Sequence, residues 1–221
     1  MNQKILVWDV PTRVFHWLLA LSFTGAFLTA ESERYRDIHV MLGYTLLGLI
    51  AFRLLWGFAG TRYARFRSFQ FSPAELGAYL TSLVRSEPRH YVGHNPAGSL
   101  AIWLLLLLGF TSGVTGLVLY QDIGGDTLEE LHEFLAYAML TVVGVHLAGV
   151  VVSSLMHREN LVRAMITGRK PADPDAGIKR AHAWLGVIML AAVVAFWGGY
   201  SGTGLMASGG NSPVVVQHGD D

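Results

Sequence analysis

With 221 residues, 52% of them hydrophobic and only 14% charged, the chain carries its apolar residues in long blocks, a pattern typical of a membrane protein. The absence of cysteine excludes disulfides, thiolate metal sites, iron–sulfur clusters and thioether-linked haem. Because the formal net charge is zero, overall charge gives no reason to expect a nucleic-acid partner.

The apolar blocks predict an all-α integral membrane protein with five spans. We expect an up-and-down four-helix bundle in residues 1–171, with spans at about 11–30, 38–58, 99–120 and 131–157. Residues 172–221 add a fifth transmembrane helix at about 183–200 and a flexible tail rich in Gly and Ser. Arg13 and His16 interrupt the first block, and no convincing cleavage site closes it, so we expect this span to be retained rather than removed as a signal peptide.

Two local patterns add detail to this outline. In the polar segment 59–98, Ser72 and Glu75 form a capping-box pattern around Pro73, which predicts a short interfacial helix from Pro73 to Val84. In the third span, Gly109 and Gly113 are four residues apart, as small residues are where membrane helices pack closely.

Lys and Arg are distributed unevenly among the connections. Thirteen lie in the N-terminal segment and in the second and fourth connections, against two in the first connection and none in the third or in the tail. The positive-inside rule then predicts that the N-terminus is cytoplasmic and that the C-terminus lies outside.

The fourth span carries two histidines, His132 and His146, fourteen residues apart. At 100° per residue they lie within about 40° of each other on one helical face, roughly 21 Å apart along the axis. His39 and Arg53 are also fourteen residues apart on the second span, so they occupy the same two depths. Ionisable residues inside a membrane are costly, so we take this arrangement as a functional site.

The predicted orientation sorts the histidines into two layers. His16 and His146 fall near the cytoplasmic ends of their spans, whereas His39 and His132 fall near the outer ends. Two imidazoles that face each other across a bundle suit the two axial positions of a low-spin haem. We therefore predict that His39 pairs with His132 as iron ligands, and that His16 pairs with His146.

Each of these residues also has a simpler interpretation. A single histidine at a span end is more often an interfacial residue than a ligand, although four in matched layers favour ligation. Arg53 could extend its side chain to the cytoplasmic interface, or it could bind a haem propionate near the inner pair. Gly43, Gly48, Gly144 and Gly149 could serve helix packing or let a flat macrocycle approach the backbone; these alternatives stay open at the sequence level.

Several segments together resemble the di-haem membrane cytochrome b family, which includes the b-type subunits of nickel-iron hydrogenases, the gamma subunit of formate dehydrogenase and bacterial cytochrome b561. The resemblance covers roughly residues 4–171. The matching segments are WDVPTRVFHW at 8–17, His39 through Gly43 and Tyr44, FRLLWGF at 52–58, GHNPAG at 93–98, and the His132/His146 pair.

The resemblance implies a four-helix core with two b haems, in which the corresponding histidines bind iron and electrons are exchanged with quinone. On this basis we expect transmembrane electron transfer in a bacterial inner membrane, by the electron-transfer subunit of an oxidoreductase complex. The expected partners are lipid, quinone and a periplasmic redox protein or catalytic subunit, with a homo-oligomer left open. The alternatives are a self-standing cytochrome b561-type oxidase of a small reductant and, remotely, a metal or proton transporter.

The quinone site is the least defined of these expectations. His94 and Asn95, at the cytoplasmic start of the third span, offer polar groups beside an apolar helix, as a quinone head requires. The same residues read equally well as a helix start, with Pro96 in the first turn.

Overall fold

The computed structural model describes residues 3–85 and 89–202, and the predicted flexible tail from residue 203 on lies outside them. Most of the described chain is helical, which confirms the all-α prediction. The helices are α1 (Val10–Thr29), α2 (Arg36–Ala59), α3 (Pro73–Val84), α4 (Pro96–Leu119), α5 (Gly125–Met156), α6 (Leu161–Thr167) and α7 (Ala183–Gly202), with two short strands, β1 (Gln3–Leu6) and β2 (Arg169–Ala172).

The helix starts follow their local sequence. The Asp9 side chain accepts a hydrogen bond from the Thr12 amide at 2.8 Å and so caps α1. Ser72 and Glu75 form the predicted capping box at the start of α3. α4 begins at Pro96, three residues before the predicted span, because Asn95 caps it.

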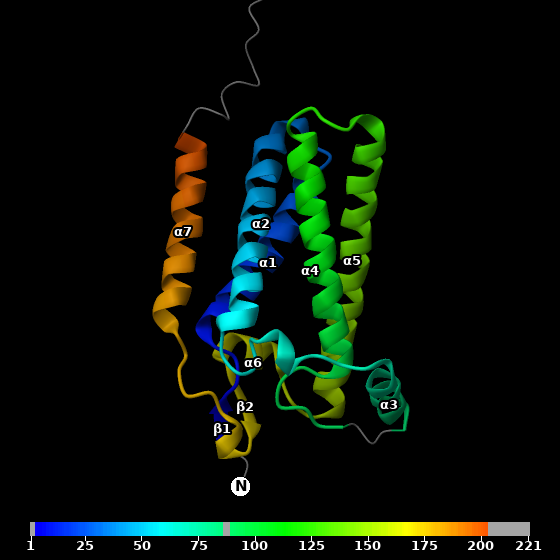
Figure 1. Cartoon of the computed structure of the whole chain (residues 1–221), viewed down its shortest axis with the longest axis vertical. Helices are drawn as coiled ribbons and strands as arrows, with labels where there is room; N and C mark the ends of the chain where they lie inside the picture. The colour runs from blue at the N-terminus through cyan, green and yellow to red at the C-terminus, as the bar shows by residue number, and fades with distance from the viewer. Residues whose placement is uncertain (1–2, 86–88, 203–221) are drawn as a thin grey trace, which may run out of the picture.

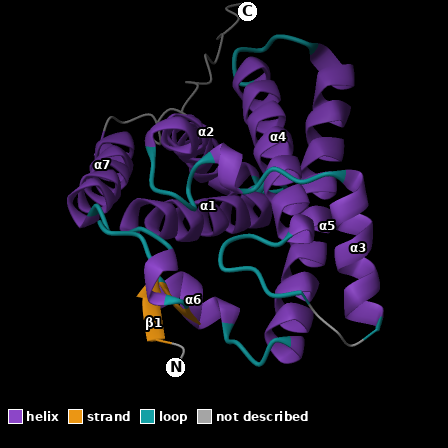
Figure 2. Cartoon of the chain, turned by 60° about the horizontal axis from the view of Figure 1, so that its bottom comes forward, coloured by secondary structure: helices purple, strands orange, loops and turns teal. Residues whose placement is uncertain are grey.

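The long helices run side by side, with α7 next to α1 and α2 (Figure 1). The extensive pairings are those of α1 with α2 and α7, α2 with α4, and α4 with α5. The α1–α2 and α4–α5 connections lie at one end, which we call the outer end, and β1, β2, α3 and α6 lie at the other, which we call the inner end; Figure 2 brings the inner end forward. Successive connections therefore alternate between the ends, as an up-and-down bundle requires.

Within the described residues, four helices are long and apolar enough to cross a membrane, which makes the chain a multi-pass membrane protein. They lie in Glu33–Ala59, Pro96–Leu119, Gly125–Met156 and Ala183–Tyr200. α1, predicted as the first span, is not among them, because Arg13 and His16 lower its mean hydropathy. It packs against both α2 and α7, so less of its surface needs to suit lipid.

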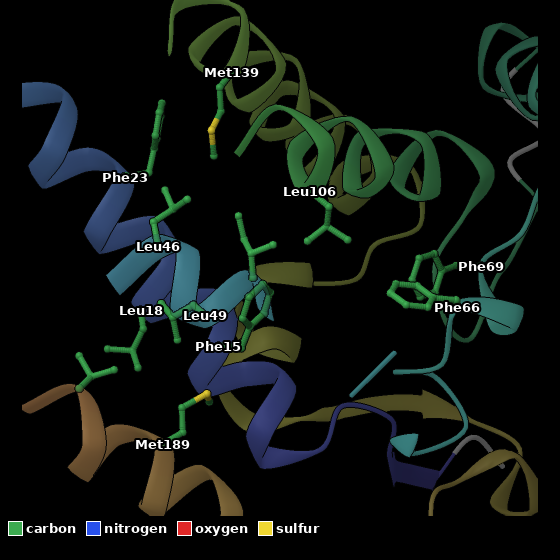
Figure 3. Packing of buried hydrophobic residues seen from close by; sticks show 12 residues of the cluster. Phe15, Leu18, Phe23, Leu46, Leu49, Phe66, Phe69, Leu106, Met139 and Met189 are labelled. Carbon is green, nitrogen blue, oxygen red and sulfur yellow. The ribbon is translucent and has the colours of Figure 1, made fainter. Parts of the chain in front are cut away.

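The fifth predicted span, α7, is packed into the same core as the other helices. Met189 and Val193 are buried in the cluster that contains Phe15 and Leu18 of α1 (Figure 3). Trp197 Nε1 donates a hydrogen bond to Thr45 Oγ1 on α2 at 2.9 Å. α7 is therefore attached to the bundle by apolar and polar contacts along its length.

Sequence patterns did not predict the small sheet at the inner end. β1 and β2 are antiparallel, with Gln3 opposite Ala172. Beside them, the buried Lys170 ammonium lies 3.3 Å from the Glu159 carboxylate and donates to the Tyr91 carbonyl at 3.0 Å. These contacts hold the N-terminal segment and the chain after α5 together, next to the start of α4.

Candidate functional site

The two histidines of the predicted outer pair meet near the outer end of the bundle. His39, from the first turn of α2, and His132, from α5, have ring centres 6.2 Å apart and ring planes at 76°. Two metal–imidazole bonds of about 2 Å each, plus roughly 1 Å from each nitrogen to its ring centre, would place the ring centres roughly 6 Å apart. The observed spacing therefore fits two imidazoles bound to opposite sides of one iron.

Hydrogen bonds fix the orientation of both outer rings. His39 Nδ1 lies 2.8 Å from the Ala26 carbonyl of α1, and His132 Nδ1 lies 3.0 Å from the Ser112 carbonyl of α4. A carbonyl can only accept, so each Nδ1 carries the proton and each Nε2 keeps its lone pair. Metal-binding histidines are commonly oriented in this way.

Close packing on α4 holds the His132 ring in place. A Cβ added to Gly116 would lie 3.0 Å from His132 Cε1, so a larger residue there would push the ring away. Thr115 Oγ1 also lies 3.0 Å from His132 Nδ1. Gly116 and Thr115 are therefore positioning residues that the sequence analysis did not identify.

The predicted inner residues gather at the other end. Burial is the main reason why the pKa of His94 is lowered from 6.5 to about 3. The charges of Arg53 and Lys170 and the protonated forms of His146 and His16 lower it further, in that order. His94 thus lies within electrostatic range of both members of the predicted inner pair and of Arg53. His16 Nδ1 is buried and has no hydrogen-bond partner among the described residues.

Arg53 is a buried cation at the inner end, with only 3% of its surface exposed. Its guanidinium lies over the rings of Phe66 and Phe69, at 5.1 Å and 5.4 Å from their centres. One terminal nitrogen is buried without a hydrogen-bond partner in the described part of the chain. A side chain held this way does not extend to the interface, and it can receive an anionic group.

His94 and Asn95 have different surroundings. The His94 ring is enclosed by aromatic side chains, 4.6 Å from Trp8 and 5.0 Å from Phe69 between ring centres, and its Nδ1 is buried without a partner among the described residues. The Asn95 side chain accepts a hydrogen bond from the Gly98 amide at 2.7 Å. Asn95 therefore serves as a helix cap, whereas His94 remains a candidate ligand-binding side chain.

An apolar layer separates the two histidine layers. Phe23, Leu46 and Met139 each lie seven residues from a predicted ligand on their own helix, and all three are buried in one cluster. Figure 3 shows these three side chains near one another. The bundle thus has a polar layer at each end and a dry layer between them.

The glycines fall into two groups. A Cβ at Gly109 would lie 2.9 Å from Ile50, and one at Gly113 would meet Leu47, so these two permit close contact between α4 and α2, as predicted. A Cβ at any member of the second group would have nothing within 4 Å in the described structure: Gly43 and Gly48 on α2, and Gly144 and Gly149 on α5. The second group therefore makes no close helix contact in the described structure.

Asp9 is a buried residue whose role the sequence did not reveal. Besides capping α1, its carboxylate accepts hydrogen bonds from Trp56 Nε1 at 3.1 Å and from Thr61 Oγ1 at 2.6 Å. It therefore connects the start of α1, which carries His16, to the end of α2, which carries Arg53. Asp9 ahead of Pro11 is a local sequence signal for a helix cap, but its partners Trp56 and Thr61 lie 47 and 52 residues away in the chain.

Comparison with known proteins identifies relatives of this chain. Among the curated relatives are proteins named "Probable Ni/Fe-hydrogenase B-type cytochrome subunit". The protein of Rhizobium leguminosarum bv. viciae is 27% identical, over 76% of this chain and 90% of its own length. Those of Rhodobacter capsulatus and Azotobacter vinelandii are 24% and 25% identical, over 79% and 76% of this chain and 84% and 88% of their own lengths. No solved structure gives a significant match.

A family model matches most of the chain. The model described as prokaryotic cytochrome b561 covers residues 7–168, which include all four predicted ligands, Arg53 and His94. Histidine side chains inside an apolar bundle are suitable ligands for the iron of a b-type haem. The chain therefore belongs to the prokaryotic cytochrome b561 family, and it is a membrane protein that transfers electrons through haem b.

Proposed function

We propose that this chain holds two b haems, one at each end of the bundle, and exchanges electrons between a redox partner at the outer end and quinone at the inner end. The family supports haem b and electron transfer. The observation that carries the proposal furthest is the 6.2 Å spacing of the His39 and His132 rings, each with its Nδ1 against a backbone carbonyl.

At the outer end, His39 and His132 would bind iron through Nε2. Their Nδ1 hydrogen bonds set the tautomer in advance, so neither ring has to reorient when haem binds. Bound haem iron alternates between the ferric and ferrous states and so carries one electron, while the protein supplies ligands, spacing and a dry environment. The open space beside Gly43, four residues after His39, would admit the edge of the macrocycle.

At the inner end, His16 and His146 would be the iron ligands. Support comes from their shared proximity to His94 and from the open space beside Gly144 and Gly149 on either side of His146. Arg53 would bind a propionate, because a carboxylate would supply the acceptor that its buried terminal nitrogen lacks within the described chain.

The two haem positions would be separated by the Phe23, Leu46 and Met139 layer, roughly 21 Å apart as measured by helix rise. Apolar side chains in this layer exclude water and keep the local dielectric constant low. Electrons would therefore cross the membrane inside the bundle, between sites of fixed spacing.

Quinone would bind beside His94. With its pKa lowered to about 3, His94 is neutral at pH 7, so one ring nitrogen can donate a hydrogen bond to a quinone oxygen. Trp8 and Phe69 provide the apolar walls that a quinone head needs. Because the Asn95 carbonyl oxygen caps α4, Asn95 could contact quinone only through its amide nitrogen.

The names of the relatives support a catalytic partner. Those proteins are named as cytochrome subunits of Ni/Fe-hydrogenases, so we propose a hydrogenase-like or other periplasmic catalytic subunit at the outer end of this chain. The positive-inside count supports a bacterial inner membrane with the N-terminus in the cytoplasm. Co-purification would separate this arrangement from a self-standing cytochrome b561-type oxidase, which would be isolated alone.

An absorption spectrum with haem quantitation tests the proposal. We expect two haems per chain, with split alpha bands on dithionite reduction; a folded but colourless protein would exclude haem altogether. No group of three or more His, Asp or Glu side chains that could hold a metal ion lies within residues 3–85 and 89–202, so nothing there favours a metal transporter.

The quinone site has its own test. His94→Ala should slow electron exchange with a soluble quinone while both haems are retained, and His90→Ala, an exposed histidine at the same end, should leave the rate unchanged. Loss of a haem in His94→Ala, or unchanged quinone kinetics, would remove His94 from the quinone site.

A further inference from the structure

A small basic cavity lies at the inner end, away from the histidine layers. It has a volume of about 290 Å³ and is formed between the turn after α2 and the segment that leads into α7. Its charged and titratable lining consists of Arg62, Lys179, Arg180 and His182. No Asp or Glu belongs to this lining, so the cavity presents cationic groups from two segments more than a hundred residues apart.

The cationic groups of this cavity are not neutralised within the described chain. Among the described residues, the ion pair is that between Lys170 and Glu159, neither of which lines the cavity. Arg62, Lys179 and Arg180 therefore have no carboxylate partner among the described residues. The Asp9 carboxylate, which accepts a hydrogen bond from Thr61 Oγ1, is 1% exposed and accepts three hydrogen bonds in all. Like charges held around one hollow repel each other, and an anion would relieve that repulsion.

The walls of the cavity are held in place by backbone contacts. The Ile178 amide donates to the Leu6 carbonyl at 2.8 Å, and the Val10 amide donates to the Ala181 carbonyl at 2.9 Å. The His182 ring lies against Trp56, with ring centres 5.4 Å apart. The basic side chains therefore project from a backbone that is fixed to β1, α1 and α2.

The position of the cavity indicates what kind of anion it would meet. Its lining lies just beyond the end of α2 at Ala59 and just before the start of α7 at Ala183. The next residue, Trp184, is 63% exposed, as tryptophans are at a membrane–water interface. Further along α7, Val187 and Ile188 are exposed apolar side chains that lipid chains can cover.

We propose that this basic cavity binds the phosphate of an anionic phospholipid, with the acyl chains lying along the outer face of α7. Arg62 and Arg180 approach the phosphate from opposite segments, and Lys179 and His182 add charge at its rim. The lipid thereby joins the end of α2 to the start of α7. This site is independent of the haem and quinone proposals, because none of its lining residues belongs to those sites.

The test uses the full-length chain with its haem content unchanged. The protein is reconstituted in nanodiscs of phosphatidylcholine with a minor fraction of phosphatidylglycerol, transferred to detergent, and examined by native mass spectrometry for retained lipid. We expect retention of phosphatidylglycerol in preference to phosphatidylcholine. Each surface cation contributes about a fivefold change in affinity for anionic lipid, so Arg62→Gln should weaken retention about fivefold, and Arg62→Gln with Arg180→Gln roughly 20- to 30-fold.

A matched double variant serves as the control. Arg85→Gln with Arg89→Gln removes the same number of positive charges from the same end of the bundle, but neither residue lines the cavity. This control should retain phosphatidylglycerol as the unmodified chain does. Equal loss in both double variants, or equal retention of both lipids by the unmodified chain, would overturn the proposal. Displacement of the lipid by millimolar inorganic phosphate would also overturn it, because the cavity would then be a site for the free anion.

Discussion

The two histidine layers of this bundle differ in how their polar atoms are satisfied. In the outer layer, His39 and His132 each have Nδ1 next to a backbone carbonyl, at 2.8 Å and 3.0 Å, and their rings already lie at the spacing of two axial ligands. In the inner layer, buried nitrogens of His16, Arg53 and His94 have no hydrogen-bond partner within the described residues. The ring nitrogens of the outer layer are thus paired with the protein's own carbonyls, whereas buried nitrogens of the inner layer are not paired within the described residues.

The difference between the layers matters because buried polar groups without hydrogen-bond partners destabilise a fold. A buried polar group without a partner costs about 1 to 3 kcal/mol, so three of them at one place are a substantial cost to the fold. Such a cost persists where a ligand supplies the partners, and haem propionates and a quinone head would do so here. Binding of haem or quinone should therefore change the stability of the fold most at the inner layer. At the outer layer, the orientation of the two histidine rings should be the least adjustable.

The largest expected effect comes from filling the space beside the outer pair. Gly43→Leu should remove the outer haem and leave the inner one, because a leucine side chain would occupy open space that we assign to the macrocycle. The control is Gly77→Leu on α3, where a Cβ likewise meets nothing within 4 Å but no haem is proposed. Haem quantitation of the two variants decides the matter; full haem content in Gly43→Leu would show that the space has another use.

The next effect concerns the pH dependence of stability at the inner layer. The unfolded chain binds a proton at His94 below pH 6.5, whereas the folded chain, with a pKa of about 3 there, does not. Stability should therefore fall as the pH drops from 6.5 toward 3, by about 2 kcal/mol at pH 5. Thermal unfolding at pH 7.5 and pH 5 measures it.

In that experiment, His94→Gln should reduce the acid-induced loss of stability at pH 5 by about 2 kcal/mol, and the exposed His90→Gln should not. Equal acid sensitivity in the unmodified chain and in His94→Gln would mean that His94 is not buried in the neutral form.

Arg53→Leu should change the redox potential of the inner haem and not that of the outer haem. A positive charge destabilises the ferric state, so its removal should lower the midpoint potential of the inner haem and leave the outer haem nearly unchanged. For a charge about 10 Å away and an effective dielectric constant of about 20, the effect is about 1.7 kcal/mol, or roughly 70 mV. Potentiometric titration with an equal shift of both haems, or of neither, would contradict the placement of Arg53.

A smaller effect is expected at the outer layer. Thr115→Val removes one of the two oxygen atoms near His132 Nδ1 while the Ser112 carbonyl remains. Weaker hydrogen bonding makes the imidazole a poorer electron donor, so the outer potential should rise, by roughly 20 mV for about 0.5 kcal/mol. Thr111→Val, whose hydroxyl bonds only to helix carbonyls of α4, should leave that potential unchanged.

Much of the fold follows from local sequence, because helix periodicity, capping residues and proline act over a few neighbouring positions. Asn95 and the Ser72–Glu75 pair mark helix starts that the structure contains. α5 begins at Gly125, well before the predicted start at residue 131, because polar residues such as Asp126 suit a first helical turn outside the apolar span. Hydropathy alone could not reveal that part of the helix.

The features that sequence did not predict depend on residues far apart in the chain. Asp9 meets Trp56 and Thr61, and β1 pairs with β2, across separations that no local pattern encodes. The meeting of His39 and His132 was predictable, because the fourteen-residue spacing and the alternating connections together define a depth for each histidine. The carbonyls that orient the two rings were not, since main-chain acceptors carry no sequence signature.

The pairing of ligands is the central claim, and haem quantitation with reduced-minus-oxidised spectra of four single variants tests it most directly. His39→Ala and His132→Ala should deplete the same spectral component, His16→Ala and His146→Ala the other, and the double variant within a pair should lose little more than either single one. Ligands at different ends are roughly 21 Å apart, too far for two imidazoles bound to one iron. Depletion of one component by both His39→Ala and His146→Ala, with His132→Ala depleting the other, would contradict the two-layer account.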